Sequence, residues 1–345
     1  MRIAVLGVGL IGGSVALAAR ERLGAEVLGW DPDPKALTAA TGCGAIDRPM
    51  TSPREAGDCE LLLVAGPVAT LATGVQEALA VAGPGAVVTD VGSTKAALVE
   101  ATTDPRFIGG HPVAGAETSG VAHARADLFA GATWYLTPRP DTDGELYERL
   151  HRFVAGLGAV PTAIEHHEHD RVLAAVSHLP HVLANVLVAQ AHAALGGEAM
   201  PATGGSFRDA TRVAGANPGL WAQIYAENAA ALGTQLDQVI ATLEDVRGRL
   251  GELEAWQGRA AQQRRALLEA ETQGGPLAEL RVFVPNRPGI VADLALALGR
   301  AGINIFDMSL APTQDNRHGT VVLWVAAGEA ARAGALVAEK GLSVT

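Results

Sequence analysis

A histidine with the properties of a general base lies in residues 106–115, whose sequence is Arg-Phe-Ile-Gly-Gly-His-Pro-Val-Ala-Gly. The apolar start of this stretch predicts a short strand, and the two glycines, His111 and Pro112 are typical of a turn at its end. An imidazole has an unperturbed pKa of about 6.5, so it can take a proton from an alcohol near neutral pH. We therefore interpret His111 as catalytic; the alternative is a loop histidine before a turn proline.

A second candidate site is the glycine-rich sequence Gly-Val-Gly-Leu-Ile-Gly-Gly-Ser at residues 7–14, which follows a short apolar run. The pattern predicts a strand, a tight turn and a helix whose N-terminus faces a pyrophosphate. In this motif Gly7 permits the turn, Gly9 lets the backbone approach the ligand, and Gly12 lets the helix pack against the strand. The alternative is a structural glycine turn without a ligand.

The cofactor is predicted from Asp31, which ends a second apolar run 24 residues after Gly7. A carboxylate at this position can accept hydrogen bonds from both ribose hydroxyls of NAD and would repel a 2′-phosphate. We therefore expect NAD, although Asp31 could instead cap a helix. The residues expected to contact NAD are Gly7, Gly9, Leu10, Ile11, Gly12, Asp31, Pro67 and Ser93.

These candidate residues need a sheet to position them. Apolar runs at 60–65, 86–90 and 107–109 alternate with helical patterns near 68–82 and 94–102, which predicts a doubly wound parallel sheet of the Rossmann type. Ligands bind at the carboxyl ends of the strands in such sheets, and Ser93 and His111 are both expected in turns there. Ser93 could orient a substrate hydroxyl or the imidazole, and it could also cap the following helix.

Composition excludes several classes of protein. The chain has 345 residues, of which 48% are hydrophobic and 41 are glycine, so two or three domains with apolar cores are expected. The net charge of -11 argues against nucleic acid as a partner. We find no signal peptide pattern and no uninterrupted apolar run as long as a membrane span, and therefore expect a reduced, cytoplasmic protein that is not associated with membranes.

The second half of the chain begins with a helical pattern at residues 168–268, interrupted by glycines. Arg208 and Arg212 lie four residues apart, which puts them on one face of a helix, and a guanidinium can bind a carboxylate with two hydrogen bonds. We expect them to bind a substrate with two carboxylates. The alternative is surface pairing with Asp209 or Glu227. Trp221 is expected in the core.

Several histidines in this region invite a metal interpretation, because imidazole is a common zinc ligand. Pro180 disturbs the geometry between His178 and His181, and no His-x3-His pair with a third spaced ligand stands out. We therefore predict no metal site. The three histidines nearest the start of the helical region are interpreted as a solvated helix start: His166, His167 and His169.

The C-terminal part follows a glycine-rich linker at 274–276 and has its own globular pattern. Its apolar runs and helical periodicity predict the order βαββαβ, that is, a small α+β domain. An all-helical domain that dimerises is expected between it and the N-terminal domain. The predicted domains are residues 1–165, 166–273 and 277–345.

Taken together, the motifs resemble prephenate dehydrogenases and the related arogenate and cyclohexadienyl dehydrogenases. The resemblance covers about residues 1–260 and rests on these matches: residues 7–14, Asp-Val-Gly-Ser-Thr-Lys at 90–95, Gly-Gly-His-Pro-Val-Ala-Gly at 109–115, Ser-His-Leu-Pro-His at 177–181, and Phe-Arg-Asp-Ala-Thr-Arg at 207–212. Pro-Asn-Arg-Pro-Gly-Ile at 285–290 and Gly-Ile-Asn-Ile at 302–305 resemble an ACT domain, a small module that binds amino acids.

The resemblance implies an NAD-dependent oxidative decarboxylation of prephenate in tyrosine biosynthesis, carried out by a homodimer. It assigns His178, His181 and Glu117 to the substrate site with Arg212, whereas the family often has lysine at the position of Arg208. It also implies tyrosine as an effector. The expected effector residues are Asn286, Gly289, Asn304 and Ile305.

Alternatives remain for function. The C-terminal domain could assemble subunits without binding a ligand, and the sequence does not separate prephenate from arogenate. Another NAD-dependent reductase of hydroxy acids or imines would share the pattern of the first 90 residues. A non-catalytic sensor of NAD and amino acids would share the C-terminal domain.

Overall fold

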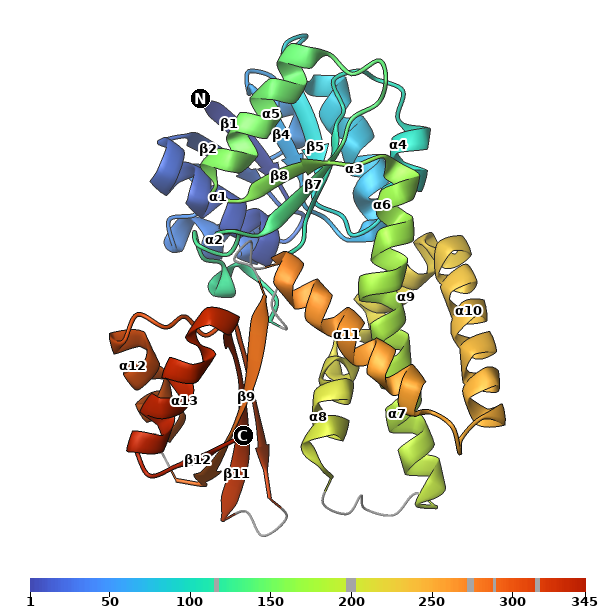
Figure 1. Ribbon diagram of the computed structural model, residues 1–345. Helices are drawn as coiled ribbons and strands as arrows, with labels where there is room; N and C mark the ends of the chain where they lie inside the picture. The colour runs from blue at the N-terminus through green and yellow to red at the C-terminus, as the bar shows by residue number, and fades with distance from the viewer. Residues whose placement is uncertain (115–117, 197–202, 272–275, 288–289, 314–316) are drawn as a thin grey trace. The chain divides into compact units, whose positions relative to one another are not determined.

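The N-terminal part of the chain is built on a parallel sheet with the strand order β3-β2-β1-β4-β5 (Figure 1). The structure is a computed structural model that describes residues 1–114, 118–196, 203–271, 276–287, 290–313 and 317–345. The predicted doubly wound sheet is confirmed. Its strands are β1 (Arg2–Leu6), β2 (Glu26–Trp30), β3 (Arg48–Pro49), β4 (Leu61–Val64) and β5 (Val87–Asp90).

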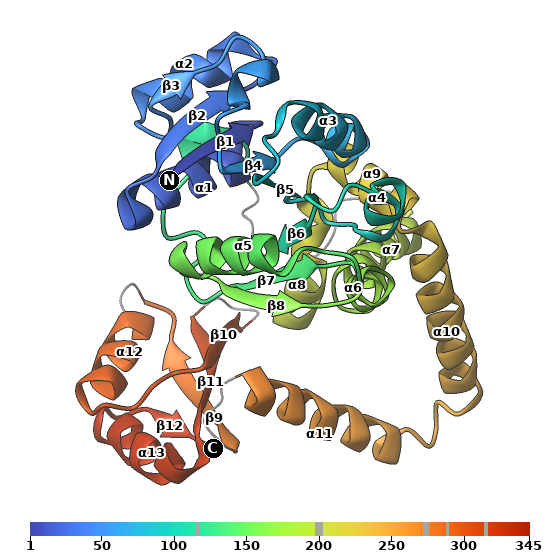
Figure 2. The same cartoon turned by 90° about the horizontal axis from the view of Figure 1, so that it is seen from above.

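Alternate side chains of each strand enter two different cores, one on each face of the sheet. Ile3 and Val5 of β1 belong to the core that also contains residues of helices α1 and α5, whereas Ala4 and Leu6 pack with helices α3 and α4. Figure 2 shows α1 and α3 on opposite sides of the sheet. Burial on both faces explains why the strands are continuous apolar runs without polar alternation. The helices around the sheet are α1 (Leu10–Leu23), α2 (Pro34–Gly42), α3 (Val68–Val81), α4 (Ala96–Ala101) and α5 (Gly144–Gly156).

A second, three-stranded sheet corrects the sequence prediction around His111. It contains β6 (Gly109–Pro112), which runs antiparallel to β7 (Thr133–Thr137), and β8 (Val160–Ala163), which runs parallel to β7. His111 pairs with Tyr135 inside β6, so the predicted turn at this position is wrong. The glycines allow a close crossing instead: a Cβ on Gly110 would lie 2.7 Å from the carbonyl oxygen of Asp90.

Helices form the region between the two α/β parts, as predicted. The helices are interrupted near the predicted glycines: α7 ends shortly before Gly196, and α8 begins after Gly204. These helices are α6 (His166–Leu173), α7 (Leu179–Ala194), α8 (Gly205–Thr211), α9 (Pro218–Glu227), α10 (Ala229–Gly248) and α11 (Glu254–Glu271).

Helices α6 and α7 join through a π-helical turn, and the run His166–Ala194 is long and apolar enough to cross a membrane by length and composition. Polar residues such as Ser177, His178 and His181 interrupt the run, so the expectation that no uninterrupted apolar run reaches the length of a membrane span is not contradicted. The first turns of the run also carry His169 and Asp170, which are buried and hydrogen-bonded within the N-terminal unit. Such contacts are those of a helix packed in a protein domain.

Contacts divide the chain into two units. The first contains Met1–Pro180 and Gly215–Asp237, and the second contains His181–Ala214 and Gln238–Thr345. Helix α9 and the start of α10 therefore belong with the parallel sheet, although they follow α8 in the sequence.

The C-terminal domain has the predicted order βαββαβ. Its antiparallel sheet has the order β10-β11-β9-β12, and one of its faces is covered by α12 and α13 through residues such as Val282, Leu294 and Val337. The elements are β9 (Leu277–Pro285), α12 (Ile290–Arg300), β10 (Asp307–Pro312), β11 (His318–Ala326), α13 (Ala330–Glu339) and β12 (Ser343–Val344).

Candidate active site

The glycine turn after β1 has the geometry that its sequence predicts. Gly7 has a φ of +103°, which glycine adopts without strain, and a Cβ on Gly12 would lie 1.9 Å from the carbonyl oxygen of Gly7. Gly9 differs, because a Cβ there would meet no atom of the described structure within 4 Å. Two of the glycines are therefore required by packing, whereas Gly9 faces open space.

Asp31 lies at the end of β2 beside this turn. Its Oδ2 accepts a hydrogen bond from the backbone N–H of Val8 (2.9 Å), and its Oδ1 accepts one from Asp33 (3.0 Å). The helix-capping alternative for Asp31 is wrong, because Asp33 is the N-cap of α2 and accepts from the N–H of Lys35. Each carboxylate oxygen retains a second lone pair that can accept a ribose hydroxyl.

Two cavities lie along the carboxyl ends of β1, β4 and β5. One, of about 640 Å³, is lined by Gly7, Trp30 and Asp31, and the other, of about 470 Å³, is lined by Leu10, Ser93 and His111. They share a wall, because both are lined by Gly9, Ala65, Gly66 and Pro67. An extended ligand could therefore cross from Asp31 to His111 over the glycine turn. Ile11 also lines the second cavity, whereas Gly12 lines neither and acts through packing.

The central feature of the site is a buried chain of two imidazoles and a carboxylate. His111 Nδ1 lies 2.9 Å from His169 Nε2, and His169 Nδ1 lies 2.7 Å from Asp170 Oδ1. When both imidazoles are neutral, His169 donates to the carboxylate and its Nε2 accepts from the Nδ1–H of His111. This arrangement leaves Nε2 of His111 as the basic nitrogen.

Burial and nearby charges shift the pKa values of His111 and Asp170. Burial, followed by the charges of His169, Lys95 and His178, holds the pKa of His111 well below its usual value. Burial alone would raise the pKa of Asp170, but hydrogen bonds from His169 and from backbone N–H groups outweigh it, so that this pKa lies below its usual value. Near neutral pH the carboxylate of Asp170 is therefore ionised and the imidazole of His111 is neutral.

Asp170 also fixes a helix. Its carboxylate accepts hydrogen bonds from the N–H groups of Lys95 (2.8 Å) and Ala96 (2.9 Å), at the start of α4. The sequence had suggested Ser93 as a possible cap, which is wrong because Lys95 is the N-cap residue of α4 and Asp170 satisfies its first N–H groups from another helix. Ser93 instead lines the cavity beside His111.

His169 and Asp170 were missed by sequence reasoning, which placed His169 on a solvated helix start. The structure buries His169 completely, together with Leu173 four residues later. That spacing is the available signal, since a histidine in register with an apolar residue at i+4 lies on the inner face of a helix. The exposed polar neighbours of His169 obscured it.

A buried ion pair supports the strand that carries His111. Lys95 and Asp90 are both fully buried and form a salt bridge. The carboxylate of Asp90 also accepts from the N–H groups of Gly92 (2.8 Å) and Gly110 (3.1 Å), which ties β5 to the residue before His111. Because a buried charge is costly unless it is paired, these contacts fix the backbone of the site.

The far side of the second cavity comes from helices of the same unit. His178 is buried, its Nδ1 lies 3.1 Å from the side-chain nitrogen of Asn228, and its ring meets that of Trp221 edge to face. His178 and Trp221 line the cavity with His111. The expected core position of Trp221 is therefore wrong: its ring is half-buried and forms part of the wall.

The remaining predicted substrate residues lie elsewhere in the chain. Arg208 is exposed on α8, and Arg212 follows as the C-cap residue with helical backbone angles. Burial and then the charge of Arg212 lower the pKa of His181. These three residues belong to the second unit. Glu117 lies outside the described residues.

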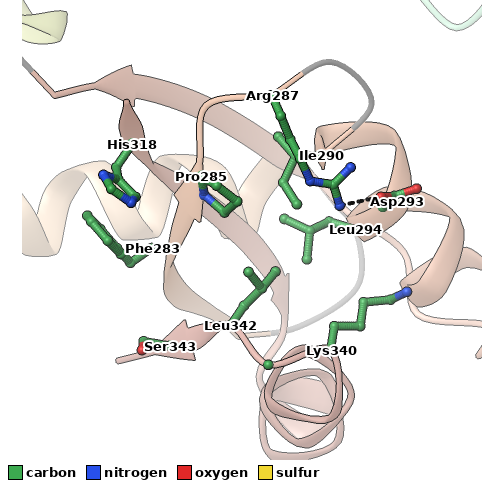
Figure 3. Close-up of a pocket in the computed structure, with 11 residues that line it drawn as sticks. Phe283, Pro285, Arg287, Ile290, Asp293, Leu294, His318, Lys340, Leu342 and Ser343 are labelled. Carbon is green, nitrogen blue, oxygen red and sulfur yellow. Dashed lines mark hydrogen bonds and ion pairs between the residues drawn. The ribbon is translucent and has the colours of Figure 1, made fainter. Parts of the chain in front are cut away.

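A third cavity, of about 600 Å³, lies within the C-terminal domain (Figure 3). Arg287 and Asp293 form an ion pair of 3.1 Å on its wall, and Lys340 and the stacked rings of Phe283 and His318 also line it. Of the expected effector residues, Asn286, Asn304 and Ile305 are not among its lining residues, and Gly289 lies outside the described residues.

Comparison with known proteins identifies the class of these domains. Residues 15–162 match a model of the prephenate dehydrogenase nucleotide-binding domain, residues 165–257 match the prephenate dehydrogenase dimerization domain, and residues 278–345 match the ACT domain. The chain is thus an oxidoreductase with a nucleotide-binding domain and a C-terminal ACT domain. The first match begins at residue 15, so the glycine turn rests on its own geometry.

Individual relatives agree with this class. Prephenate dehydrogenase of Bacillus subtilis is 31% identical over 334 residues, which cover 92% of this chain and 90% of that protein. Cyclohexadienyl dehydrogenase of Zymomonas mobilis is 33% identical over 71% of this chain and 87% of its own length. The crystal structure of prephenate dehydrogenase from A. aeolicus, in complex with hydroxyphenyl propionate and NAD+, has a TM-score of 0.71 at 29% identity and covers 77% of this chain and 98% of that one. The chain belongs to the prephenate dehydrogenase family.

The glycine turn yields a test that separates binding from folding. Gly9→Ala should leave the melting temperature unchanged, because the added Cβ meets no atom of the described structure, yet it should weaken NAD binding roughly tenfold or more by blocking the approach of the ligand. Titration calorimetry and thermal denaturation measure the two effects. Gly12→Ala is the matched control and should destabilise the fold. Unchanged NAD affinity in Gly9→Ala would contradict the assignment of this turn.

Proposed function

We propose that this protein catalyses the NAD-dependent oxidative decarboxylation of prephenate to 4-hydroxyphenylpyruvate. The observation that carries the proposal is the position of His111, on the wall of a cavity with its Nδ1 held by His169 at 2.9 Å. Membership of the family supplies the reaction class, and the hydrogen-bonded chain supplies the base that this reaction needs.

The residues of the first unit fit NAD. The two cavities that meet at Gly9 and Pro67 suit the two halves of a dinucleotide, and Asp31 offers a carboxylate to a ribose. The open space at Gly9 suits a pyrophosphate at the N-terminus of α1. Gly9, Asp31 and Pro67 would hold NAD, which would supply the hydride acceptor for the reaction.

The proposed step at His111 is proton removal. Nε2 of His111 takes the proton of the ring hydroxyl while hydride leaves the ring carbon that bears this hydroxyl. Ser93 orients the hydroxyl or the imidazole. The hydrogen bond to His169 keeps the proton of His111 on Nδ1, so the basic nitrogen is the one available to substrate. Loss of the ring carboxylate as carbon dioxide then makes the ring aromatic, and this provides most of the driving force.

The two carboxylates of the substrate require positively charged or hydrogen-bond-donating partners. We propose that Arg212 binds one carboxylate of prephenate, with Arg208 or His181 at the other, and that Glu117 and His178 order the polar groups of the pocket. A planar guanidinium suits this role because it can make two parallel hydrogen bonds to one carboxylate. Arg212 accordingly is expected to contribute to KM.

A specific observation keeps arogenate as a second candidate substrate. One close relative is a cyclohexadienyl dehydrogenase, and prephenate and arogenate differ only by a keto against an amino group on the side chain. The cavity around His111 would receive the same ring in both cases. The proposal for the substrate therefore extends to arogenate as an alternative.

Regulation is proposed for the C-terminal domain. We infer that tyrosine, the end product of the pathway, binds there and inhibits the enzyme, and that the chain works as a cytoplasmic homodimer. The match to an ACT domain supports a small-molecule effector, and the match to a dimerization domain supports a dimer. The binding site is proposed near Asn286, Gly289, Asn304 and Ile305.

The base assignment is tested with His111→Asn, which keeps a polar side chain of similar size but cannot accept the proton. We expect kcat to fall by roughly 10² to 10⁴, the usual contribution of a general base. Rates of NAD reduction should be measured with prephenate, arogenate and simple 2-hydroxy acids. A kcat of His111→Asn within a few-fold of wild type would contradict the role of His111. If the wild-type enzyme acted on 2-hydroxy acids alone, a different reaction would replace the proposed one. Tyrosine binding without any turnover would indicate a sensor.

A pH profile tests the buried chain. Because His111 must be neutral to act and its pKa is held well below 6.5, kcat/KM should stay constant as pH falls to that value and decline only at lower pH. His169→Leu removes the partner of Nδ1 and should lower kcat more than His169→Asn, which retains an acceptor. An acidic limb at or above pH 6.5 in the wild-type enzyme would exclude His111 as the titrating base.

The effector proposal is tested with Asn304→Ala, which should raise the tyrosine concentration for half inhibition roughly tenfold or more by loss of polar contacts with the ligand. Lys340→Ala tests whether tyrosine binds instead in the cavity of Figure 3, which Lys340 lines. Arg332→Ala, on the surface of α13, is the control and should leave inhibition unchanged. Steady-state rates with increasing tyrosine measure the effect. Inhibition that survives deletion of residues 277–345 would place the effector site outside this domain.

A further inference from the structure

We propose that Glu100, His166 and His167 form a binding site for a divalent transition-metal ion such as Zn²⁺, which clamps helix α4 to helix α6. One ligand atom from each residue lies within 4.8 Å of the other two. Around a tetrahedral zinc ion with bonds of about 2.0–2.1 Å, ligand atoms are separated by about 3.4 Å, so small side-chain rotations close the site. The pair His167 Nε2 and Glu100 Oε1 is already 3.1 Å apart.

The three ligands come from the end of one helix and the beginning of another. Glu100 lies in the last turn of α4, whereas His166 and His167 are the first residues of α6. The rings of the two histidines are 4.4 Å apart between centroids. Two imidazoles and one carboxylate are a donor set that zinc favours, with a water molecule as the usual fourth ligand.

A further carboxylate supports one of the histidines. Glu165 Oε1 lies 2.9 Å from Nδ1 of His166, and the other oxygen of Glu165 accepts a hydrogen bond from the N–H of Glu168. A histidine that donates from Nδ1 to a carboxylate keeps Nε2 for a metal, and such partners increase the basicity of the ligand. The carboxylates of Glu100 and Glu165 also offset the positive end of the α6 dipole, which would otherwise oppose a cation.

The site is accessible from solvent and separate from the cavity beside His111. The side chains of Glu100 and His167 are 58% and 61% exposed, whereas that of His166 is 21% exposed. Surface pairs of this kind contribute little stability by themselves. Glu100, His166 and His167 do not line the cavity beside His111, so a bound ion would act on the fold of the site and not on the reacting atoms.

The position of this cluster connects it to the catalytic chain. Asp170 of the first unit already binds the beginning of α4 through Lys95 and Ala96. A metal ion on Glu100 would bind the end of the same helix to the beginning of α6, three residues before His169. Helix α4 would then be held to the helical run at both ends, and the alignment of His169 with His111 would become more rigid.

The experiment uses the full chain without an affinity tag, freed of metal with a chelator. Titration with Co²⁺, followed by its visible absorption, and with Zn²⁺, followed by calorimetry, should show one ion bound per chain with a dissociation constant below about 10⁻⁴ M, and Zn²⁺ at 100 times that constant should stabilise the fold by about 2.7 kcal/mol. His166→Ala, His167→Ala and Glu100→Gln should each weaken binding by roughly tenfold or more, because each removes one ligand.

Controls separate this site from other histidines and from folding. His123→Ala removes an exposed histidine of the same unit and should leave the affinity unchanged. The melting temperatures of the metal-free variants should equal that of the wild type, and so should their metal-free kcat. Absence of binding, an adventitious ion only, with millimolar affinity, or an affinity that none of the three substitutions changes would each overturn the proposal.

Discussion

The carboxylate of Asp170 is the contact on which the arrangement of the site depends. It accepts hydrogen bonds from two backbone N–H groups at the start of α4 and from the ring of His169, all at 2.7–2.9 Å. One ionised group thus accepts hydrogen bonds from the N–H groups that have no partner within α4, and it orients the imidazole of His169. The charge at the start of α4 and the tautomer of His169 are therefore set together.

Lys95, whose backbone N–H is bound by Asp170, also forms a fully buried salt bridge with Asp90 through its side chain. Asp90 satisfies two backbone N–H groups besides Lys95, one of them on Gly110, directly before His111. A low-dielectric environment strengthens these contacts and also disfavours a second positive charge nearby. This is the physical reason why a buried imidazole between Lys95 and two further histidines remains neutral.

The C-terminal domain follows a different logic. Its core is a set of alternating apolar residues, such as Val282 and Val284 of β9, which pack under two helices and need no buried charge. Its polar groups lie at the rim of a cavity, where Arg287 and Asp293 remain partly exposed.

The sequence alone predicted β1, β2, β4, β5 and the glycine turn, because these elements depend on local rules. Apolar runs of strand length, glycines where a Cβ would collide, and an aspartate at the end of β2 are readable without any long-range contact. The order βαββαβ at the C-terminus follows from the same periodicity. Several helix boundaries fall within a few residues of the predicted ones for this reason.

Only the tertiary structure decided the partners of these residues. His169 and Asp170 stand among charged neighbours in the sequence, and their burial arises from packing against α4 and β6, which lie about 60 to 75 residues earlier. Likewise His111 lies in a strand because β7 pairs with it, and a local pattern of glycine and proline cannot reveal such a pairing. The sequence singled out His111, and long-range packing decides which of its ring nitrogens is held by His169.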